Sequence, residues 1–140
     1  MPNHLHATIA FRKTGKSINK IIGDEKRFIG YEIIKRLKEK ERFDLLQILE
    51  DAVNRSDKKR GKLHEVWEDS FDWKECDGDK FIWQKLDYMH MNPCIKKWLL
   101  ADNAFEYIHS SARFYISGEH GIYTVMNFGE LEDINLTVPY

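Results

Sequence analysis

Residues 81–93 read FIWQKLDYMHMNP, and apolar side chains recur through this stretch at the three- and four-residue spacing of an α-helix. We expect a helix over Phe81–Asn92, because Pro93 cannot continue one. The buried stripe of this helix should consist of Ile82, Leu86 and Met89.

The residues before this stretch predict two more helices. Ser17 is a suitable N-cap for a long amphipathic helix that runs to about Leu37. A second amphipathic segment follows over Phe43–Val53. Residues 55–62 read RSDKKRGK, and this polar, basic run should be a loop.

Strands are predicted where apolar and polar residues alternate. His4–Phe11 reads HLHATIAF, with Leu5 and Ile9 on one face and the two histidines on the other. Leu63–Trp73 should contain a short strand. Later elements are a short helix over Ile95–Leu100, a helical turn that Ser110 or Ser111 caps and that ends near Tyr115, and a tail after about Phe128.

Length and composition are those of a single soluble domain. The chain has 140 residues and a mass of 16.7 kDa, with 42% hydrophobic and 32% charged residues. No apolar run approaches the roughly 20 residues of a membrane span, and MPNHLH does not resemble a signal peptide. Cys76 and Cys94 form no CxxC pair, so we expect no disulfide framework and a cytoplasmic location.

The charge is unevenly distributed along the chain. Residues 1–62 hold 16 Lys and Arg against 9 Asp and Glu, whereas residues 63–140 hold 6 against 14. A basic half on a chain of net charge −1 is typical of a surface that faces a polyanion. A solvated helix face would give the same pattern.

Two short patterns could carry chemistry. His4 and His6 project to one side of the predicted strand, about 6–7 Å apart, where two imidazoles can share a divalent cation. Tyr88 and Asn92 lie one turn apart on the predicted helix. Each pattern has a plainer interpretation, in which the histidines are incidental, the tyrosine packs and the asparagine ends the helix.

Taken together, the patterns resemble a known family. MPNHLH before an apolar strand, and YMHMNP over residues 88–93, resemble the single-tyrosine HUH transposases, most closely the REP-associated tyrosine transposases of the insertion-sequence type. The likeness runs from residue 1 to about residue 128. It includes SINKIIGDEKRFIGYEI over residues 17–33, Val66-Trp67, and SSARFY over residues 110–115 followed by Gly118-Glu119.

The resemblance implies an α+β fold, an antiparallel sheet flanked by helices in the ferredoxin-like arrangement. The domain would cover residues 1–128, and residues 129–140 would be a C-terminal tail. Family members carry a strand and a helix before this motif, roughly another 40–50 residues, so the domain is expected to be truncated at its N-terminus. A late gene start, a decayed element, or a homodimer completed by strand or helix exchange would each explain this.

The resemblance also implies an activity. The enzyme would cleave and rejoin single-stranded DNA near hairpins through a 5′-phosphotyrosine intermediate, with Tyr88 as the nucleophile. His4, His6 and Asn92 would hold a divalent metal, and mixed nitrogen and oxygen ligands leave Mg²⁺ and Mn²⁺ both open. No ATP-binding loop is present in the sequence.

Basic side chains would bind the DNA phosphates with a salt-dependent affinity. The DNA-binding residues are predicted to be Lys20, Lys26, Arg27, Lys35, Arg36, Lys58, Lys59 and Arg60. An alternative is a catalytically inactive protein, derived from such a transposase, that binds hairpin or single-stranded DNA. A third is an interaction module in which these residues only pack. No membrane partner is expected.

Overall fold

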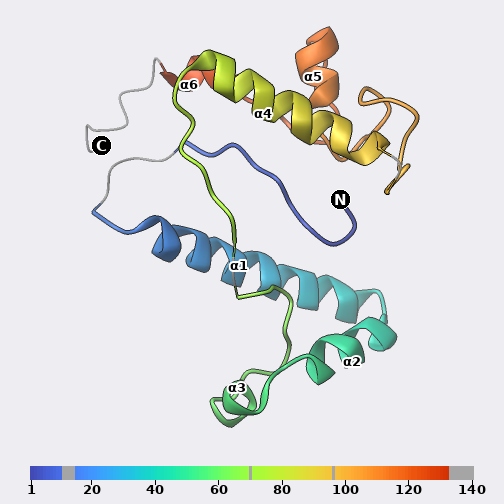
Figure 1. Cartoon of the computed structure of the whole chain (residues 1–140). Coiled ribbons are helices and arrows are strands. Elements are labelled where there is room, and N and C mark those ends of the chain that lie inside the picture. Colours follow the sequence, from blue (N-terminus) through green and yellow to red (C-terminus); the bar gives the residue numbers. More distant parts are fainter. Residues whose placement is uncertain (11–14, 70, 96, 133–140) are drawn as a thin grey trace. The chain divides into compact units, whose positions relative to one another are not determined.

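A computed structural model describes residues 1–10, 15–69, 71–95 and 97–132 of the chain. The described residues form helices joined by turns and irregular segments, and they contain no β-strand (Figure 1). The predicted α+β fold with an antiparallel, ferredoxin-like sheet is therefore wrong. The chain divides into two compact units, Thr14–Trp73 and a second unit of Met1–Lys13 with Lys74–Tyr140.

The unit Thr14–Trp73 begins with the long helix α1 (Ile18–Glu39), as predicted. The Ser17 hydroxyl accepts a hydrogen bond from the Lys20 amide at 3.3 Å and caps its first turn. The chain leaves α1 through Glu41, which has a φ of +53°. The amides of Glu41 and Arg42 donate back to the last turn of α1, so the chain reverses before α2 (Phe43–Asp51).

Few residues form the interior of this unit. Leu46 and Val53 are buried, and the indole of Trp67 lies against Gly30, where an added Cβ would come within 3.7 Å of its Nε1. The same Nε1 donates a hydrogen bond to the carbonyl oxygen of Lys26 at 2.8 Å. Trp67 therefore fixes the segment after the helices against the middle of α1.

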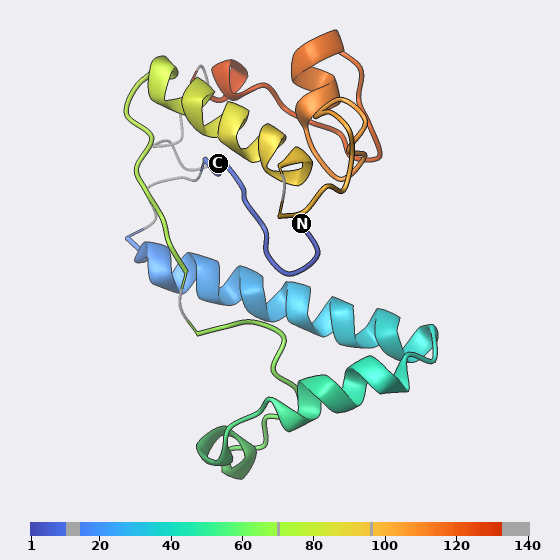
Figure 2. The same cartoon turned by 45° about the vertical axis from the view of Figure 1, so that its right-hand side comes forward.

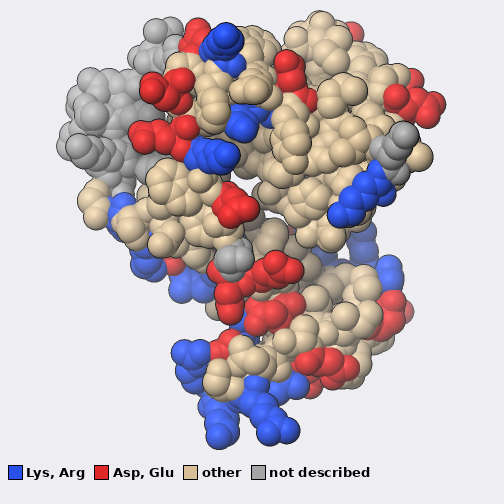
Figure 3. Space-filling model, in the orientation of Figure 1, with Lys and Arg blue, Asp and Glu red and all other residues tan. Residues whose placement is uncertain are grey.

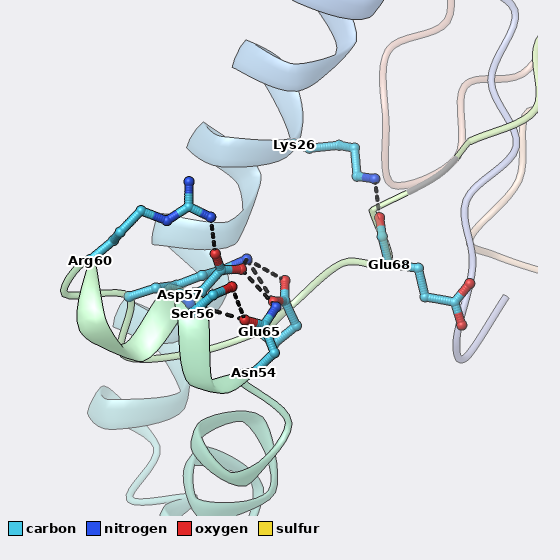
Figure 4. Close-up of polar contacts among 8 residues, drawn as sticks. Lys26, Asn54, Ser56, Asp57, Arg60, Glu65 and Glu68 are labelled. Carbon is cyan, nitrogen blue, oxygen red and sulfur yellow. Dashed lines mark hydrogen bonds and ion pairs between the residues drawn. The ribbon is translucent and has the colours of Figure 1, made fainter.

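The predicted loop over residues 55–62 is wrong in its first half, which forms the short helix α3 (Arg55–Lys59). The Asn54 side chain accepts a hydrogen bond from the Asp57 amide at 2.9 Å and starts the helix. Asp57 also pairs with Arg60, and Lys62 pairs with Glu65 at 2.6 Å (Figure 4). Capping and short-range ion pairs allow this polar segment to form a helix.

In the other unit, α4 (Asp79–Met91) forms where the periodicity predicts it, and the 3₁₀ helix η1 (Asn92–Cys94) continues it. Ile82 and Leu86 are buried together with Phe128, and Met89 and Tyr115 pack against them. The predicted stripe is confirmed. Figures 1 and 2 show α4 beside α5 (Ala112–Ser117) and α6 (Phe128–Glu132), which complete this core.

The helical turn predicted after Ser110 and Ser111 is confirmed by α5, which ends at Ser117 rather than near Tyr115. Ser111 holds the N-cap position without a side-chain cap bond, and the Ser110 hydroxyl accepts a hydrogen bond from the Ala112 amide at 3.1 Å. The predicted helix over Ile95–Leu100 is a single turn among the described residues, since Trp98 and Leu99 donate to the Ile95 carbonyl. Residue 96 of that prediction and residues 133–140 of the predicted tail lie outside the described residues. The predicted domain boundary at residue 128 stays a prediction.

Both predicted strands are irregular segments in the structure. Residues 4–10 have no regular structure, and Leu5 and Ile9 on the expected apolar face are 65% and 51% exposed. Residues 63–69 and 71–73 are likewise not strands. A strand exists only through pairing with a neighbour, and alternation of residues does not supply that partner. Phe11 lies outside the described residues.

Candidate functional site

Helix α4 presents two polar residues beside its buried stripe. Asn92 follows the last residue of α4 and is 5% exposed, whereas Tyr88 one turn earlier is 57% exposed. Pro93 is fully buried and fixes the chain at this end. The carboxamide is therefore held inside the unit, and the phenol is open to a ligand from solvent.

His6 reaches this end of α4 from the irregular N-terminal segment. The Asn92 Nδ2 donates a hydrogen bond to His6 Nε2 at 3.1 Å. Because the amide nitrogen is a donor only, Nε2 carries a lone pair and the proton of the neutral ring is on Nδ1. A nitrogen lone pair of His6 is thus directed at Asn92.

His4 lies next to His6, with their ring centroids 4.9 Å apart and the rings nearly perpendicular. His4 Nδ1 donates to the Asn3 side-chain oxygen at 2.8 Å. This hydrogen bond leaves Nε2 of the neutral ring as the nitrogen with a lone pair. Metal-binding histidines are commonly oriented in this way by an acceptor at their second nitrogen.

Tyr88 completes the group, since its ring centroid lies 5.7 Å from that of His6. All four residues predicted for the site are therefore together in one unit, although 82 positions separate His6 from Tyr88. This closeness was predicted from the resemblance alone. The helical spacing of Tyr88 and Asn92 placed only those two residues near each other.

The two histidines are suited to binding a cation at neutral pH. Burial is the main cause that lowers the pKa of His4, and the nearby Lys97 lowers it further. Burial also lowers the pKa of His6, with His4 as the next cause. A lower pKa keeps each imidazole neutral, which is the form that binds a metal.

The separation of His6 and Asn92 is compatible with shared binding of a divalent cation. An octahedral ion with bonds of about 2.1 Å places adjacent ligand atoms about 3 Å apart, close to the separation of His6 Nε2 and the Asn92 amide. Rotation of that amide by half a turn would present its oxygen instead of its nitrogen. Within the described ranges, no group of three or more His, Cys, Asp or Glu side chains gathers at one point. In the predicted ligand set, Asn92 is the third residue beside the two histidines.

His90 is a structural residue that the sequence patterns did not single out. It is buried on the same side of α4 as Leu86, four residues earlier, and its Nε2 shares a hydrogen bond with Ser111 Oγ at 2.9 Å. Burial lowers its pKa, which Asp87 partly offsets. The bond ties the end of α4 to the start of α5 and so holds Tyr88 and Asn92 in place. The spacing from Leu86 was the one signal for it.

The residues predicted to bind DNA lie in the other unit, where many are paired with acids. Asp24 pairs with Lys20 and Arg27, Glu39 with Lys35, and Glu32 with Arg36. Lys26 donates to the Glu68 carbonyl oxygen (Figure 4). Residues 14–73 hold 14 Lys and Arg against 13 Asp and Glu, because Glu65, Glu68, Asp69 and Asp72 offset the basic residues before them.

A smaller basic cluster remains around α3. Lys58 and Lys59 are exposed and make no ion pair with any described residue, and Arg60 lies beside them. Figure 3 shows Lys and Arg gathered at this end of the unit. No helix among the described residues has the length and apolar character that crossing a bilayer requires.

A surface pocket of about 320 Å³ adjoins three of the four site residues, His4, Tyr88 and Asn92. It is lined by Asn3, His4, Tyr88, Asn92, Ile95, Lys97 and Trp98. Comparison of the chain with models of protein families, with curated proteins and with solved structures gives no match.

Proposed function

We propose that this protein cleaves and rejoins single-stranded DNA through Tyr88, as the single-tyrosine HUH transposases do. The observation that carries the proposal is the convergence of His4, His6 and Asn92 beside an exposed phenol. Two neutral imidazoles, one amide and one nucleophile are the parts that metal-assisted phosphoryl transfer needs.

The Tyr88 oxygen would attack a backbone phosphorus. The bond from phosphorus to the 3′-oxygen of the preceding nucleotide breaks, and a bond from phosphorus to Tyr88 forms. The phenol loses one proton and the released 3′-oxygen gains one. The product is a 5′-phosphotyrosine and a free 3′-hydroxyl, and attack by another 3′-hydroxyl reverses the step. No ATP is consumed, since the phosphodiester bond is exchanged rather than hydrolysed.

The other residues would position the reactants. His4, His6 and Asn92 would hold Mg²⁺ or Mn²⁺, which withdraws charge from the phosphate oxygens when it is bound. Asn92 is fixed to α4 one turn from Tyr88, so cation and nucleophile keep one spacing. His90 would maintain this end of α4 through Ser111.

A second function is favoured by the cluster at α3. Lys58, Lys59 and Arg60 form an exposed basic surface, which would bind DNA phosphates whether or not Tyr88 reacts. A catalytically inactive protein that binds hairpin or single-stranded DNA is the function they would support. The homodimer and the cytoplasmic location stay predictions.

Covalent capture of DNA distinguishes the two functions. The substrate is a pool of single-stranded oligonucleotides with a hairpin beside a randomised tract, incubated with Mn²⁺ and separated under denaturing conditions. A 3′-end label should migrate with the protein, and a 5′-end label should not, because Tyr88 keeps the 5′-phosphate. Tyr88→Phe should abolish the adduct.

Tyr123→Phe is the matched control, since Tyr123 is 58% exposed in the same unit. It should leave the adduct yield unchanged. Adducts that persist in Tyr88→Phe would overturn the assignment of the nucleophile. Binding of the pool without any adduct in the unaltered protein would favour the second function.

A further inference from the structure

The chain after α4 folds back on itself and places an aromatic ring next to the site. The Leu100 amide donates to the carbonyl oxygen of buried Pro93 at 2.8 Å, and the Trp98 amide donates to that of Ile95 at 2.9 Å. Within this turn, Trp98 comes to lie against the N-terminal segment, with its ring centroid 5.5 Å from that of His4.

Trp98 and Lys97 line the same pocket as Tyr88. The Lys97 ammonium lies 5.1 Å from the centroid of the Trp98 ring. The pocket volume of about 320 Å³ falls at the lower end of the ~300–1,000 Å³ that is usual for ligand sites. An aromatic face and a cation beside each other match the two parts of a nucleotide, its base and its phosphate.

The other tryptophans are placed differently. The indole of Trp67 packs against Gly30 and donates a hydrogen bond to the Lys26 carbonyl oxygen. Trp83 packs edge-to-face against Tyr115 and Phe128. Trp73 is 55% exposed but lies in the unit that lacks Tyr88. Trp98 is thus the tryptophan whose surroundings suit a ligand of the candidate site.

We propose that Trp98 and Lys97 bind one unpaired nucleotide of the DNA strand next to the phosphate that Tyr88 attacks. The base stacks on the Trp98 indole, and the Lys97 ammonium moves from that ring to the phosphate of the same nucleotide. The inference rests on the proposed function and names the subsite that holds its substrate. Stacking is possible only for a base outside a duplex, so this pocket would select single-stranded DNA.

The test measures binding in a Tyr88→Phe background, so that no covalent product forms. The probes are a fluorescent oligothymidine and an abasic oligonucleotide of the same length, followed by fluorescence anisotropy. Trp98→Ala should weaken oligothymidine binding about 5- to 150-fold, the range expected for loss of one stacked base. Its affinity for the abasic strand should not change. Trp98→Phe should restore most of the lost affinity.

Lys97→Gln should weaken binding of both probes and reduce the slope of log affinity against log salt by about 0.7, the effect of one phosphate contact on a single strand. Trp73→Ala is the control and should bind both probes as the background protein does. Binding of the abasic strand also reports on the folding of Trp98→Ala, because a folding defect would weaken binding of both probes. In that case Trp98→Phe is used instead, and its preference for oligothymidine over the abasic strand tests the subsite.

Two results separate the inference from the function on which it rests. If adducts form through Tyr88 but Trp98→Ala binds oligothymidine with unchanged preference over the abasic strand, or Trp98→Phe binds the abasic strand normally and keeps none of that preference, the nucleotide subsite is wrong and the function stands. If the protein binds neither probe and forms no adduct, the proposed function fails, and the subsite fails with it. An equal loss of oligothymidine affinity in Trp73→Ala and Trp98→Ala would also overturn the subsite.

Discussion

The two halves of the candidate site are held in different ways. Tyr88 lies on α4 and Asn92 directly follows it, the other side of that helix is buried against Phe128, and His90 fastens it to α5. His4 and His6 belong to an irregular segment, and no backbone hydrogen bond joins residues 1–10 to any other described residue. One half is fixed by the core and the other by contacts within the site.

This difference indicates how the site would respond to a ligand. Helix α4 should keep its position whether or not a cation is bound. The histidine segment is held by the Asn92–His6 hydrogen bond and by ring contacts with Tyr88 and Trp98. We therefore expect a ligand of the two imidazoles to order that segment with little change in the helix.

The largest effect should come from the core of α4. Leu86→Ala removes a side chain that is 4% exposed and should lower the free energy of unfolding by about 2–5 kcal/mol. Leu5→Ala, in the N-terminal segment, should change it by less than about 0.5 kcal/mol. Urea denaturation followed by circular dichroism measures both. Similar decreases in the free energy of unfolding would mean that the N-terminal segment is as firmly packed as α4.

Metal binding should stabilise the weaker half. Mn²⁺ at a hundred times its dissociation constant should raise the free energy of unfolding by about 2.7 kcal/mol. The double variant His4→Ala, His6→Ala should lose this effect, which thermal melting detects. His109→Ala, with an exposed histidine of the same unit, should keep it. Stabilisation that survives the double variant would place the cation elsewhere.

Acid should destabilise the anchored half through His90. Burial lowers the pKa of His90 below its ordinary value of 6.5, so the unfolded chain binds more protons between the two pKa values. The contribution of neutral His90 to the free energy of unfolding is fully present above pH 6.5. It is lost as the pH falls through 6.5 toward the lower pKa. The urea concentration at the unfolding midpoint should therefore be lower at pH 5.5 than at pH 7.5.

His4 and His6 change stability with the same sign, since burial lowers the pKa of each. The comparison that isolates His90 is therefore His90→Gln, which should reduce the difference between the two midpoints. His109→Gln should retain it. An unchanged difference in His90→Gln would assign the acid sensitivity to other groups.

The smallest expected effect concerns the turn that carries Trp98. Leu99 has a φ of +42° and is exposed, so its side chain gains little from packing while its backbone is strained. Leu99→Gly should raise the free energy of unfolding by about 0.5–1 kcal/mol, which is the strain relieved minus the cost of the greater entropy of glycine in the unfolded chain. Leu99→Val should lower it. Chemical denaturation of the pair tests both signs.

The helices were predictable because their signals are local. The stripe of Ile82, Leu86 and Met89 and the cap at Ser17 each depend on residues within one or two turns. The sheet was not predictable from such signals, since a strand at His4 needs a partner that the local pattern does not identify. The cap at Asn54 is also local, and the basic composition of residues 55–62 obscured it.

The candidate site was predictable only in part. Its residue types and the four-residue spacing of Tyr88 and Asn92 are visible in the sequence, and the resemblance supplied the pairing with the histidines. The His90–Ser111 hydrogen bond was missed because it joins residues 21 positions apart, and the contact of Trp98 with His4 was missed because it forms through a turn without a sequence signature.

The shared use of α4 by the core and by the candidate site limits how this chain can vary in length. Each residue added to a helix turns everything beyond it by about 100°. An insertion between Leu86 and Tyr88 would carry the phenol and the carboxamide together away from the imidazoles while Ile82 stayed buried. An insertion after Cys94, where the helical geometry has ended, would lengthen a turn without rotating either group. Related chains that retain the chemistry should therefore differ in length after η1 and not within α4.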